Sequence, residues 1–251
     1  MQPAAIAEAA RLLAGVQRGE PRLVALPTGA QPATFAEAAA IQVAILAALG
    51  ESAAGYKVAG VDPDSVMWGA VLGSRAKPSP AVFRAAAVPM LGVEPEIAFR
   101  LESEITAADR RVTLAEFDRL VSVVPAIEVV DTRFTSYERT PLLHRAADFM
   151  SNGGLVFGAP WIGVAPTELA TLGVALHVGG RCVAEVSGGH PAGDPRLPAL
   201  AFLRAPGRPD RLPRGTIITT GSYAGLHRAR PGDRVVASFA GRGELTLSFE
   251  A

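Results

Sequence analysis

Val93-Glu94-Pro95-Glu96-Ile97-Ala98-Phe99 is the segment on which both the fold and the site depend. Its apolar residues predict a β-strand, and residues i and i+2 of a strand point to the same face of the sheet. Glu94 and Glu96 therefore lie side by side, where their charges repel each other unless a cation lies between them. The pattern leaves two interpretations open: a solvated strand face with Pro95 at the sheet edge, or part of a metal site.

A third glutamate, Glu128, lies in a segment that is otherwise apolar, Val123-Val124-Pro125-Ala126-Ile127-Glu128-Val129-Val130. Such a run indicates a strand that is buried on both faces. A buried carboxylate is costly unless it is paired or bound to a metal. The partner of Glu128 is therefore either an arginine such as Arg133, or a cation that it shares with Glu94 and Glu96. Ligation by oxygen atoms alone is typical of Mg²⁺, Mn²⁺ or Ca²⁺ sites.

The other patterns predict helices near the N-terminus and mostly strands after them. Helical periodicity and capping patterns predict helices over residues 4–16, 34–49, 113–120 and 197–203. Extended patterns predict strands over residues 56–58, 93–101, 121–130, 172–178, 181–187, 216–220, 234–239 and 244–249, with a hairpin turn at Gly179-Gly180. Residues 61–89 are expected to be rich in loops. We therefore expect an α+β, mostly β chain, with a helical N-terminal lobe over residues 1–50 and a mixed β catalytic domain over residues 51–251.

The 251 residues are 49% hydrophobic and carry no formal net charge. This composition supports one sizeable core and does not favour nucleic acid or an anionic membrane as a partner, because both attract a basic excess. The single cysteine, Cys182, excludes an internal disulfide and a multi-cysteine zinc site. Residues 1–19 lack a basic leader followed by an apolar run, and glycines and prolines interrupt the uncharged residues 149–167. We therefore expect a cytoplasmic protein without a membrane span.

Only two of the 24 lysine and arginine residues are lysines, Lys57 and Lys77. Against such a bias toward arginine, a lysine that persists is a candidate for a role that requires a compact, titratable ammonium. The sequence holds no G-x-S-x-G, H-E-x-x-H or P-loop motif, and no G-x-G-x-x-G after a strand. Its four histidines form no ligand-spaced pair. The acidic residues therefore carry most of the chemical signal.

Several motifs, taken in chain order, resemble the fumarylacetoacetate hydrolase superfamily, and within it the branch of 2-keto-4-pentenoate hydratases and 4-oxalocrotonate decarboxylases. Besides the two glutamate segments, they are Gly55-Tyr56-Lys57-Val58, Asp131-Thr132-Arg133, Ala147-Asp148-Phe149-Met150-Ser151-Asn152-Gly153-Gly154, Gly189-His190-Pro191, Gly215-Thr216-Ile217-Ile218-Thr219-Thr220-Gly221-Ser222 and Arg230-Pro231-Gly232-Asp233. The resemblance runs from about Thr34 to Phe249. It implies a rolled mixed β-sheet around a metal.

The resemblance also implies roles for individual residues. It makes Glu94, Glu96 and Glu128 ligands of Mg²⁺ or Mn²⁺. It places Lys57 near the bound substrate and Ser151 in the pocket lining, so these two are the candidate catalytic residues. Further candidates for substrate binding are Tyr56, Trp68, Asp148, Asn152 and Gly153, with loop packing as the other interpretation of Trp68. Two positions depart from the family pattern: no acid directly precedes Trp68-Gly69, and Phe149 stands where relatives commonly have asparagine.

The activity that the resemblance implies is that of a metal-dependent hydratase, a lyase acting on a 2-hydroxy-2,4-dienoate or 2-oxo acid, as in aromatic-compound catabolism. Lys57 is the candidate for proton transfer or charge support. The alternatives on the same metal site are decarboxylation of a 2-oxo diacid and C–C bond hydrolysis of a diketo acid, for which His144 or His190 could act as the base. A further alternative is an inactive homologue that retains the metal site. We expect a small 2-oxo acid as the ligand and a homo-oligomer as the assembled form.

Overall fold

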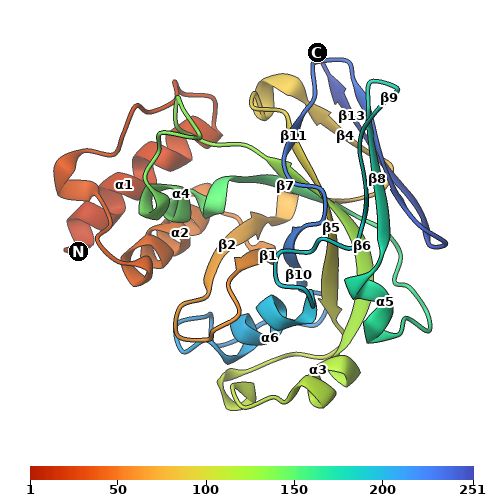
Figure 1. Cartoon of the computed structure of the whole chain (residues 1–251). Helices are drawn as coiled ribbons and strands as arrows, with labels where there is room; N and C mark the ends of the chain where they lie inside the picture. The colour runs from red at the N-terminus through yellow and green to blue at the C-terminus, as the bar shows by residue number, and fades with distance from the viewer.

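The computed structural model describes the backbone of residues 1–251 and every side chain except that of Pro166 (Figure 1). Its helices are α1 (Pro3–Gln17), α2 (Phe35–Leu49), α3 (Leu114–Leu120), α4 (Leu142–Ala147), α5 (Pro166–Ala170) and α6 (Arg196–Arg204), and a short 3₁₀ turn, η5, covers Phe149–Ser151. Its strands are β1 (Ala53–Ala59), β2 (Met67–Leu72), β3 (Ala76–Pro78), β4 (Ala81–Arg84), β5 (Gly92–Leu101), β6 (Val121–Val130), β7 (Asn152–Phe157), β8 (Gly173–Val178), β9 (Arg181–Ser187), β10 (Ile217–Ser222), β11 (His227–Arg228), β12 (Arg234–Phe239) and β13 (Gly243–Glu250).

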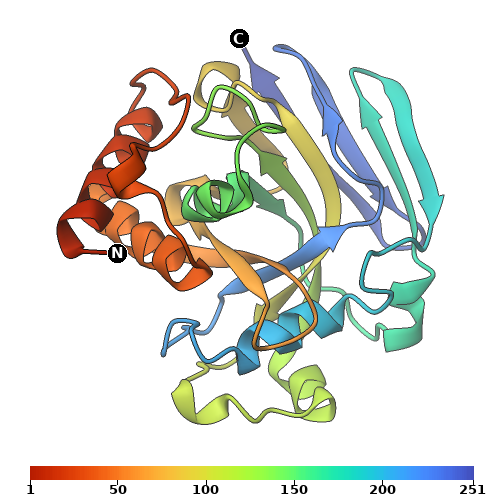
Figure 2. The same ribbon diagram turned by 60° about the vertical axis from the view of Figure 1, so that its left-hand side comes forward.

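The larger sheet has the strand order β2-β1-β10-β5-β6-β7-β3, and β11 extends the pairing beside β5. It is mixed, because β1 runs parallel to β10 and β3 runs parallel to β7, whereas the other pairs are antiparallel. The sheet curls strongly in Figures 1 and 2, and β2 near one end of the order contacts β7 near the other. The expected rolled mixed sheet is confirmed.

Strand β5 lies in the middle of this sheet, between β10 and β6. The interpretation of Pro95 as the mark of a sheet edge is therefore wrong. Proline lacks the N–H that a central strand needs, but Pro95 lies one residue beyond Glu96 and Ser222, the last paired residues of β5 and β10. Because β10 ends at Ser222, a proline is tolerated at this position of a central strand.

The smaller sheet, in the order β4-β13-β12-β8-β9, stands beside the rolled sheet (Figure 1, right). Buried and more exposed residues alternate along β8 and β12, which is the pattern of a sheet with one covered face. Strand β13 contacts β6 and β7, so the covered face lies against the outside of the rolled sheet. The predicted hairpin at Gly179-Gly180 is confirmed as the connection between β8 and β9.

Helices α1 and α2 pack against each other on the opposite side of the molecule (Figure 1, left). Thr34 caps α2 by accepting a hydrogen bond from the backbone N–H of Glu37, and Gly50 ends it in the left-handed conformation, at φ 68°. Because α2 also contacts β2 and α4, the division at residue 50 stays a prediction. None of the helices that the structure describes is both long and apolar enough to cross a membrane.

The expectation that residues 61–89 are rich in loops missed three strands, β2, β3 and β4, which lie within them. These strands have three to six residues, too few for a periodic pattern to stand out. Helix α4, with six residues, was missed for the same reason. The site depends on both kinds of missed element, since β2 and α4 bring Gly69 and Asp148 to it.

Candidate active site

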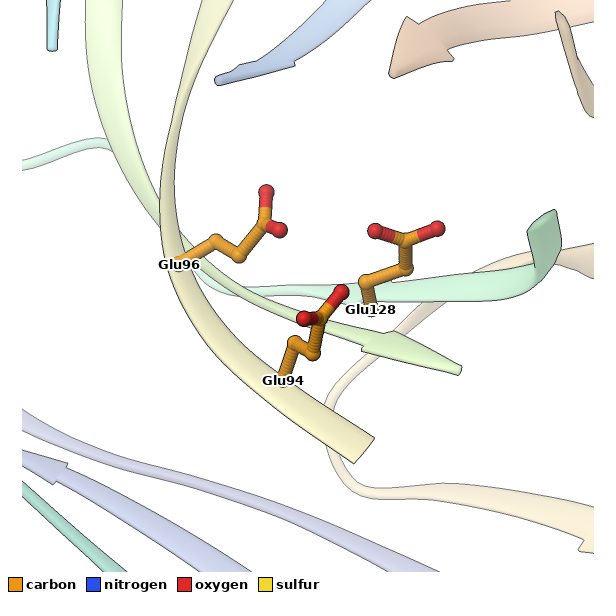
Figure 3. Close-up of side chains that lie close together, drawn as sticks. All are labelled: Glu94, Glu96 and Glu128. Carbon is orange, nitrogen blue, oxygen red and sulfur yellow. The ribbon is translucent and has the colours of Figure 1, made fainter. Parts of the chain in front are cut away.

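The antiparallel pairing of β5 with β6 places Glu94 directly opposite Glu128. Glu96 lies two residues further along β5, on the same face as Glu94. Each of the three residues offers a carboxylate oxygen that lies within 4.8 Å of the others, and Figure 3 shows the three side chains pointing toward one another. We call these residues the carboxylate cluster. Like charges that face each other across a sheet destabilise it, so the cluster requires a compensating positive charge.

Burial makes this requirement stronger, because Glu96 and Glu128 have no exposed surface. One oxygen of Glu96, Oε2, accepts hydrogen bonds from the hydroxyl of Thr219 and from the backbone N–H of Gly221. The other, Oε1, is buried and accepts a hydrogen bond from none of the residues that the structure describes. Such an unsatisfied oxygen is unusual in a native protein and indicates that something else binds it.

Two carboxylates of the cluster, those of Glu96 and Glu128, hold protons more tightly than usual. Burial, followed by the charge of Glu94, raises the pKa of Glu96 to about 7. Burial also raises the pKa of Glu128 well above its ordinary range, and the charges of Glu96 and Glu94 add to this effect, although the ammonium of Lys57 opposes it. Without a bound cation, the cluster therefore does not hold three full negative charges at neutral pH.

Lys57 reaches the cluster from β1, which is separated from β5 by β10. Its Nζ lies 2.9 Å from Oε2 of Glu128 and 3.6 Å from Oε2 of Glu94. Burial favours the neutral amine, but the charges of Glu128, Glu94 and Glu96 outweigh this effect and raise the pKa of Lys57. The lysine thus remains an ammonium. Even so, one ammonium does not balance three carboxylates.

The residues of the cluster fit a divalent cation. Three carboxylates converge, Oε1 of Glu96 is buried without a partner, and all the donor atoms are oxygens. Hard cations such as Mg²⁺, Mn²⁺ and Ca²⁺ favour this donor set. The partner that the sequence offered as an alternative, Arg133, contacts Asp148 and Asp131 instead of Glu128. The structure therefore brings together the three residues that were predicted to bind a metal, and their role as ligands stays a prediction.

The backbone that follows α4 adopts an unusual conformation close to the cluster. Phe149, Met150 and Ser151 have φ values of 52°, 55° and 59°, which lie in the left-handed region. For residues other than glycine this conformation costs roughly 1–2 kcal/mol each. The hydroxyl of Ser151 is buried and has no hydrogen-bond partner among the described residues. Strained backbone of this kind is often found at functional sites. We call Phe149–Ser151 the left-handed turn.

The left-handed turn leads directly to the carboxylate cluster. The next residue, Asn152, donates a hydrogen bond of 3.0 Å from Nδ2 to Oε1 of Glu128. Gly153 follows on β7, where an added Cβ would collide with the side chain of Asp131. Asn152 and Gly153 were both predicted to bind substrate. The structure gives Asn152 a contact with a predicted metal ligand and gives Gly153 a packing position.

Asp148 directly precedes the turn in the sequence. It is almost completely buried, and both oxygens of its carboxylate accept hydrogen bonds. Its oxygens accept hydrogen bonds from the backbone N–H and Nε of Arg133 and from the hydroxyl of Thr132. Burial raises the pKa of Asp148, and the charge of Arg133 offsets part of this rise. The structure thus places this predicted substrate-binding residue in an ion pair with Arg133, beside the turn.

Tyr56 and Trp68 lie on the other face of the rolled sheet. They alternate with Lys57 and Gly69 along β1 and β2, so their side chains point away from the cluster. Their rings lie 5.0 and 5.6 Å from the ring of Phe202. Both line a separate cavity of about 680 Å³ between α2 and the segment after α6. The structure does not bring these two predicted substrate-binding residues to the carboxylate cluster.

Two contributors to the site were not predicted. Thr219 and Gly221 supply hydrogen bonds to Glu96 from β10. The motif that contains them was noticed only as part of the family resemblance. Alternation along a strand could have shown that Thr219 and Gly221 share one face, but not that this face meets Glu96, which lies 123 residues earlier than Thr219.

Comparisons with known proteins find similar sequences over part of the chain. No family model matches the sequence. The chain is 30% identical over 131 residues to 4-oxalocrotonate decarboxylase of Pseudomonas putida, which covers 51% of this chain and 48% of that protein. It is 28% identical over 162 residues to 2-keto-4-pentenoate hydratase 1 of Dechloromonas aromatica strain RCB, which covers 62% and 59%. The chain thus spans about half to three fifths of the length of the curated relatives it matches.

Similarity in structure extends over nearly the whole chain. The structure of 4-oxalocrotonate decarboxylase from Pseudomonas putida G7, complexed with magnesium and adipate, matches 99% of this chain and 98% of that one, with a TM-score of 0.83 and 21% identity. Fumarylpyruvate hydrolase from Pseudomonas aeruginosa, in complex with Mn²⁺ and pyruvate, matches 78% of this chain and 88% of that one, with a TM-score of 0.56 and 12% identity. The chain therefore has the fold of the fumarylacetoacetate hydrolase superfamily, and over part of its length its sequence is similar to a decarboxylase and a hydratase.

Proposed function

We propose that this protein is a divalent-metal-dependent lyase that acts on a small 2-oxo acid or its 2-hydroxydienoate form. The carboxylate cluster carries the proposal, because three convergent carboxylates with a buried, unpartnered oxygen call for a cation. The sequence relatives named as a decarboxylase and as a hydratase support it. Mg²⁺ and Mn²⁺ are the cations we propose, with Glu94, Glu96 and Glu128 as their ligands.

When bound, the cation would polarise the 2-oxo group and stabilise the negative charge that develops on it. The residues of the chain provide the rest. Thr219 and Gly221 fix the carboxylate of Glu96, and Asn152 fixes that of Glu128. Because these hydrogen bonds orient the donor oxygens before anything binds, the site is preorganised for a cation.

Lys57 supplies the positive charge nearest to the cluster. An acid with a raised pKa keeps its proton, so we propose that Lys57 balances charge as an ammonium in the resting protein rather than acting as a base. A bound cation would offset the carboxylates that raise the pKa of Lys57, and would thereby allow Lys57 to donate a proton during turnover. Its contacts with Glu94 and Glu128 hold the ammonium beside the carboxylate cluster. The hydroxyl of Ser151 is the proposed second polar contact, because it is buried and has no other partner.

Hydration of a 2-hydroxy-2,4-dienoate is the reaction that we propose, and decarboxylation of a 2-oxo diacid is the second candidate. The second candidate is supported by the structural match to a decarboxylase complexed with adipate, which is a dicarboxylic acid. C–C bond hydrolysis has less support. It would require a base such as His190, whose Nδ1 accepts a hydrogen bond of 3.2 Å from the backbone N–H of Ala192 and whose ring packs against Tyr223.

An ultraviolet assay of the purified protein with Mg²⁺ or Mn²⁺ tests these reactions. The substrates are a panel of 2-hydroxydienoates and 2-oxo diacids, and release of CO₂ is measured in parallel. Loss of dienoate absorbance without CO₂ supports hydration, whereas CO₂ release from a diacid supports decarboxylation. Cation binding without turnover of any member of the panel would favour the inactive homologue. Light scattering on the same sample tests the proposed homo-oligomer.

Substitution of Lys57 tests its role. If Lys57 transfers a proton, Lys57→Arg and Lys57→Met should both lose about 10²–10⁴-fold in kcat, because arginine does not give up a proton near neutral pH. If Lys57 only balances charge, Lys57→Arg should keep much of the activity. Full activity in Lys57→Met would show that neither role is correct.

A further inference from the structure

The left-handed turn requires something to hold it, because three consecutive non-glycine residues do not adopt positive φ without support from their surroundings. Arg133 contacts both ends of this turn. Its Nη2 donates hydrogen bonds to the backbone carbonyls of Asp148 (3.1 Å) and Asn152 (2.9 Å). Its Nε and backbone N–H bind the carboxylate of Asp148. A single buried guanidinium thus joins the residue before the turn to the residue after it.

The backbone of the turn also packs against Gly69 of β2. Gly69 lies directly opposite Lys57 in the pairing of β1 with β2, so both face the interior of the rolled sheet. A Cβ built on Gly69 would overlap the backbone carbonyl of Phe149. The turn therefore fills the space that any other residue at position 69 would occupy, and this contact places it beside Lys57.

The turn also connects Arg133 to the carboxylate cluster. Asn152, whose carbonyl Arg133 binds, donates its side-chain amide to Glu128. Ser151, the last residue of the turn, carries the buried hydroxyl that has no partner among the described residues. Any change in the backbone between Asp148 and Asn152 would therefore move both the hydroxyl of Ser151 and the carboxylate of Glu128.

From these contacts we propose that Arg133 is a positioning residue: it clamps Phe149–Ser151 in the left-handed conformation and thereby sets the positions of the Ser151 hydroxyl and the Glu128 carboxylate. The inference rests on the proposed function, since it concerns the same site. Lysine cannot replace Arg133 in this role. A guanidinium presents several N–H donors in a fixed plane, whereas an ammonium is a single flexible point charge.

The variant Arg133→Lys tests the clamp, because it keeps the positive charge beside Asp148 but loses the planar donors. Residues that orient metal ligands typically contribute 10–100-fold to metal affinity or activity. We expect Arg133→Lys to lose about that factor in kcat, and to bind Mg²⁺ more weakly in a titration without substrate. The metal titration requires no turnover, so it reports on Glu128 independently of the reaction.

A second substitution should rescue the first. Met150 lies in the middle of the turn and is partly exposed. Glycine adopts positive φ as readily as negative φ. Met150→Gly should therefore remove the strain that Arg133 opposes and restore much of the lost kcat and Mg²⁺ affinity in the double variant. Rescue of this kind would not follow if Arg133 merely stabilised the core.

The matched control is Arg208→Lys. Arg208 is also a buried arginine that donates to three backbone carbonyls, those of Leu203, Pro209 and Thr106, but it contacts neither the turn nor the cluster. Arg208→Lys should lower the melting temperature without changing kcat or Mg²⁺ affinity. If Arg133→Lys does not fold, Asp148→Asn, which is nearly identical in shape, loosens the same clamp and should show the same losses.

Wild-type kcat and Mg²⁺ affinity in Arg133→Lys would overturn the inference. So would losses that Met150→Gly does not restore, or losses that Arg208→Lys reproduces. If the wild type turns over no 2-oxo acid, the proposed function fails. In that case the Mg²⁺ titration still decides the clamp: weaker binding by Arg133→Lys with rescue by Met150→Gly supports it, and unchanged binding refutes it.

Discussion

Two groups of buried charges lie near the end of β6, and they differ in charge balance. In the first, Asp148 is paired with Arg133, and Asp131 with Arg22 at 2.5 Å, so acids and arginines are equal in number. In the second, the three glutamates of the carboxylate cluster have only the ammonium of Lys57. Each group contains carboxylates that are almost completely buried, so the energetic cost of isolated charge applies to both.

This difference suggests that the first group supports the backbone, whereas the second has the properties of a binding site. In the balanced group every oxygen of Asp148 accepts hydrogen bonds from protein donors, and the pair holds the backbone of the left-handed turn. In the unbalanced group Oε1 of Glu96 has no partner among the described residues, and the pKa of Glu96 is raised. A cluster that the protein itself leaves unbalanced fits a cation, as proposed above. Substitutions in the two groups should therefore have opposite consequences.

The largest effect should follow from Glu128→Gln in the unbalanced group. A bound cation would contribute several kcal/mol to stabilising developing charge, so loss of one proposed ligand should lower kcat/KM by about 10³-fold or more. Without Mg²⁺, the variant should unfold at the same temperature as the wild type or higher, because a repelling charge has gone. Mg²⁺ should raise its melting temperature much less than that of the wild type. An equal Mg²⁺ shift in both proteins would argue that Glu128 is not a ligand.

Asp148→Ala in the balanced group should have the opposite signature. Removal of one partner leaves Arg133 buried with an uncompensated charge, which typically lowers the free energy of unfolding by about 3–5 kcal/mol. In urea unfolding this loss should already be present without Mg²⁺, where Glu128→Gln should show none. The control is Glu104→Gln, which breaks an exposed pair with Arg211 and should change the free energy of unfolding by less than about 1 kcal/mol. Similar losses in both variants would remove the distinction.

Asn152→Ala should show how far the two groups are coupled, because Asn152 contacts Arg133 through its carbonyl and Glu128 through its side chain. The substitution keeps the carbonyl and removes only the amide. We expect about a 10–100-fold loss in Mg²⁺ affinity with little change in the metal-free melting temperature. Calorimetric titration measures the first and thermal unfolding the second. A large fall in stability at unchanged affinity would assign Asn152 to the scaffold instead.

The smallest effect concerns pH in the metal-free protein. Burial and Glu94 raise the pKa of Glu96 to about 7 in the folded state, whereas its ordinary value is 4.5. The folded state therefore binds the proton more tightly, and the stability that this gives is fully present below pH 4.5 and is lost as pH rises through 7. In thermal unfolding between pH 5 and 8, Glu96→Gln should lose less stability than the wild type with rising pH. Parallel curves would mean that Glu96 does not titrate in this range.

The elements whose signals are local could be predicted from the sequence. The apolar run Val121–Val130 and the Glu-Pro-Glu segment were recognised as strands, and the capping box at Thr113 and Glu116 is confirmed at the start of α3. These features depend on neighbours within a few residues, so periodicity and capping chemistry suffice. Because both glutamate segments are strands, alternation also predicted that Glu94 and Glu96 share a face.

The contacts between distant residues became visible only in the folded protein. The fold placed Lys57 across β10 from the cluster, turned Tyr56 and Trp68 to the opposite face, and assigned Arg133 to Asp148 rather than to Glu128. It also forced the residues after α4 into the left-handed turn, which their local preferences oppose. The composition and periodicity of a segment specify its own secondary structure. Which segments become neighbours depends on how the whole sheet curls and packs, and that choice is settled by contacts between residues far apart in the chain.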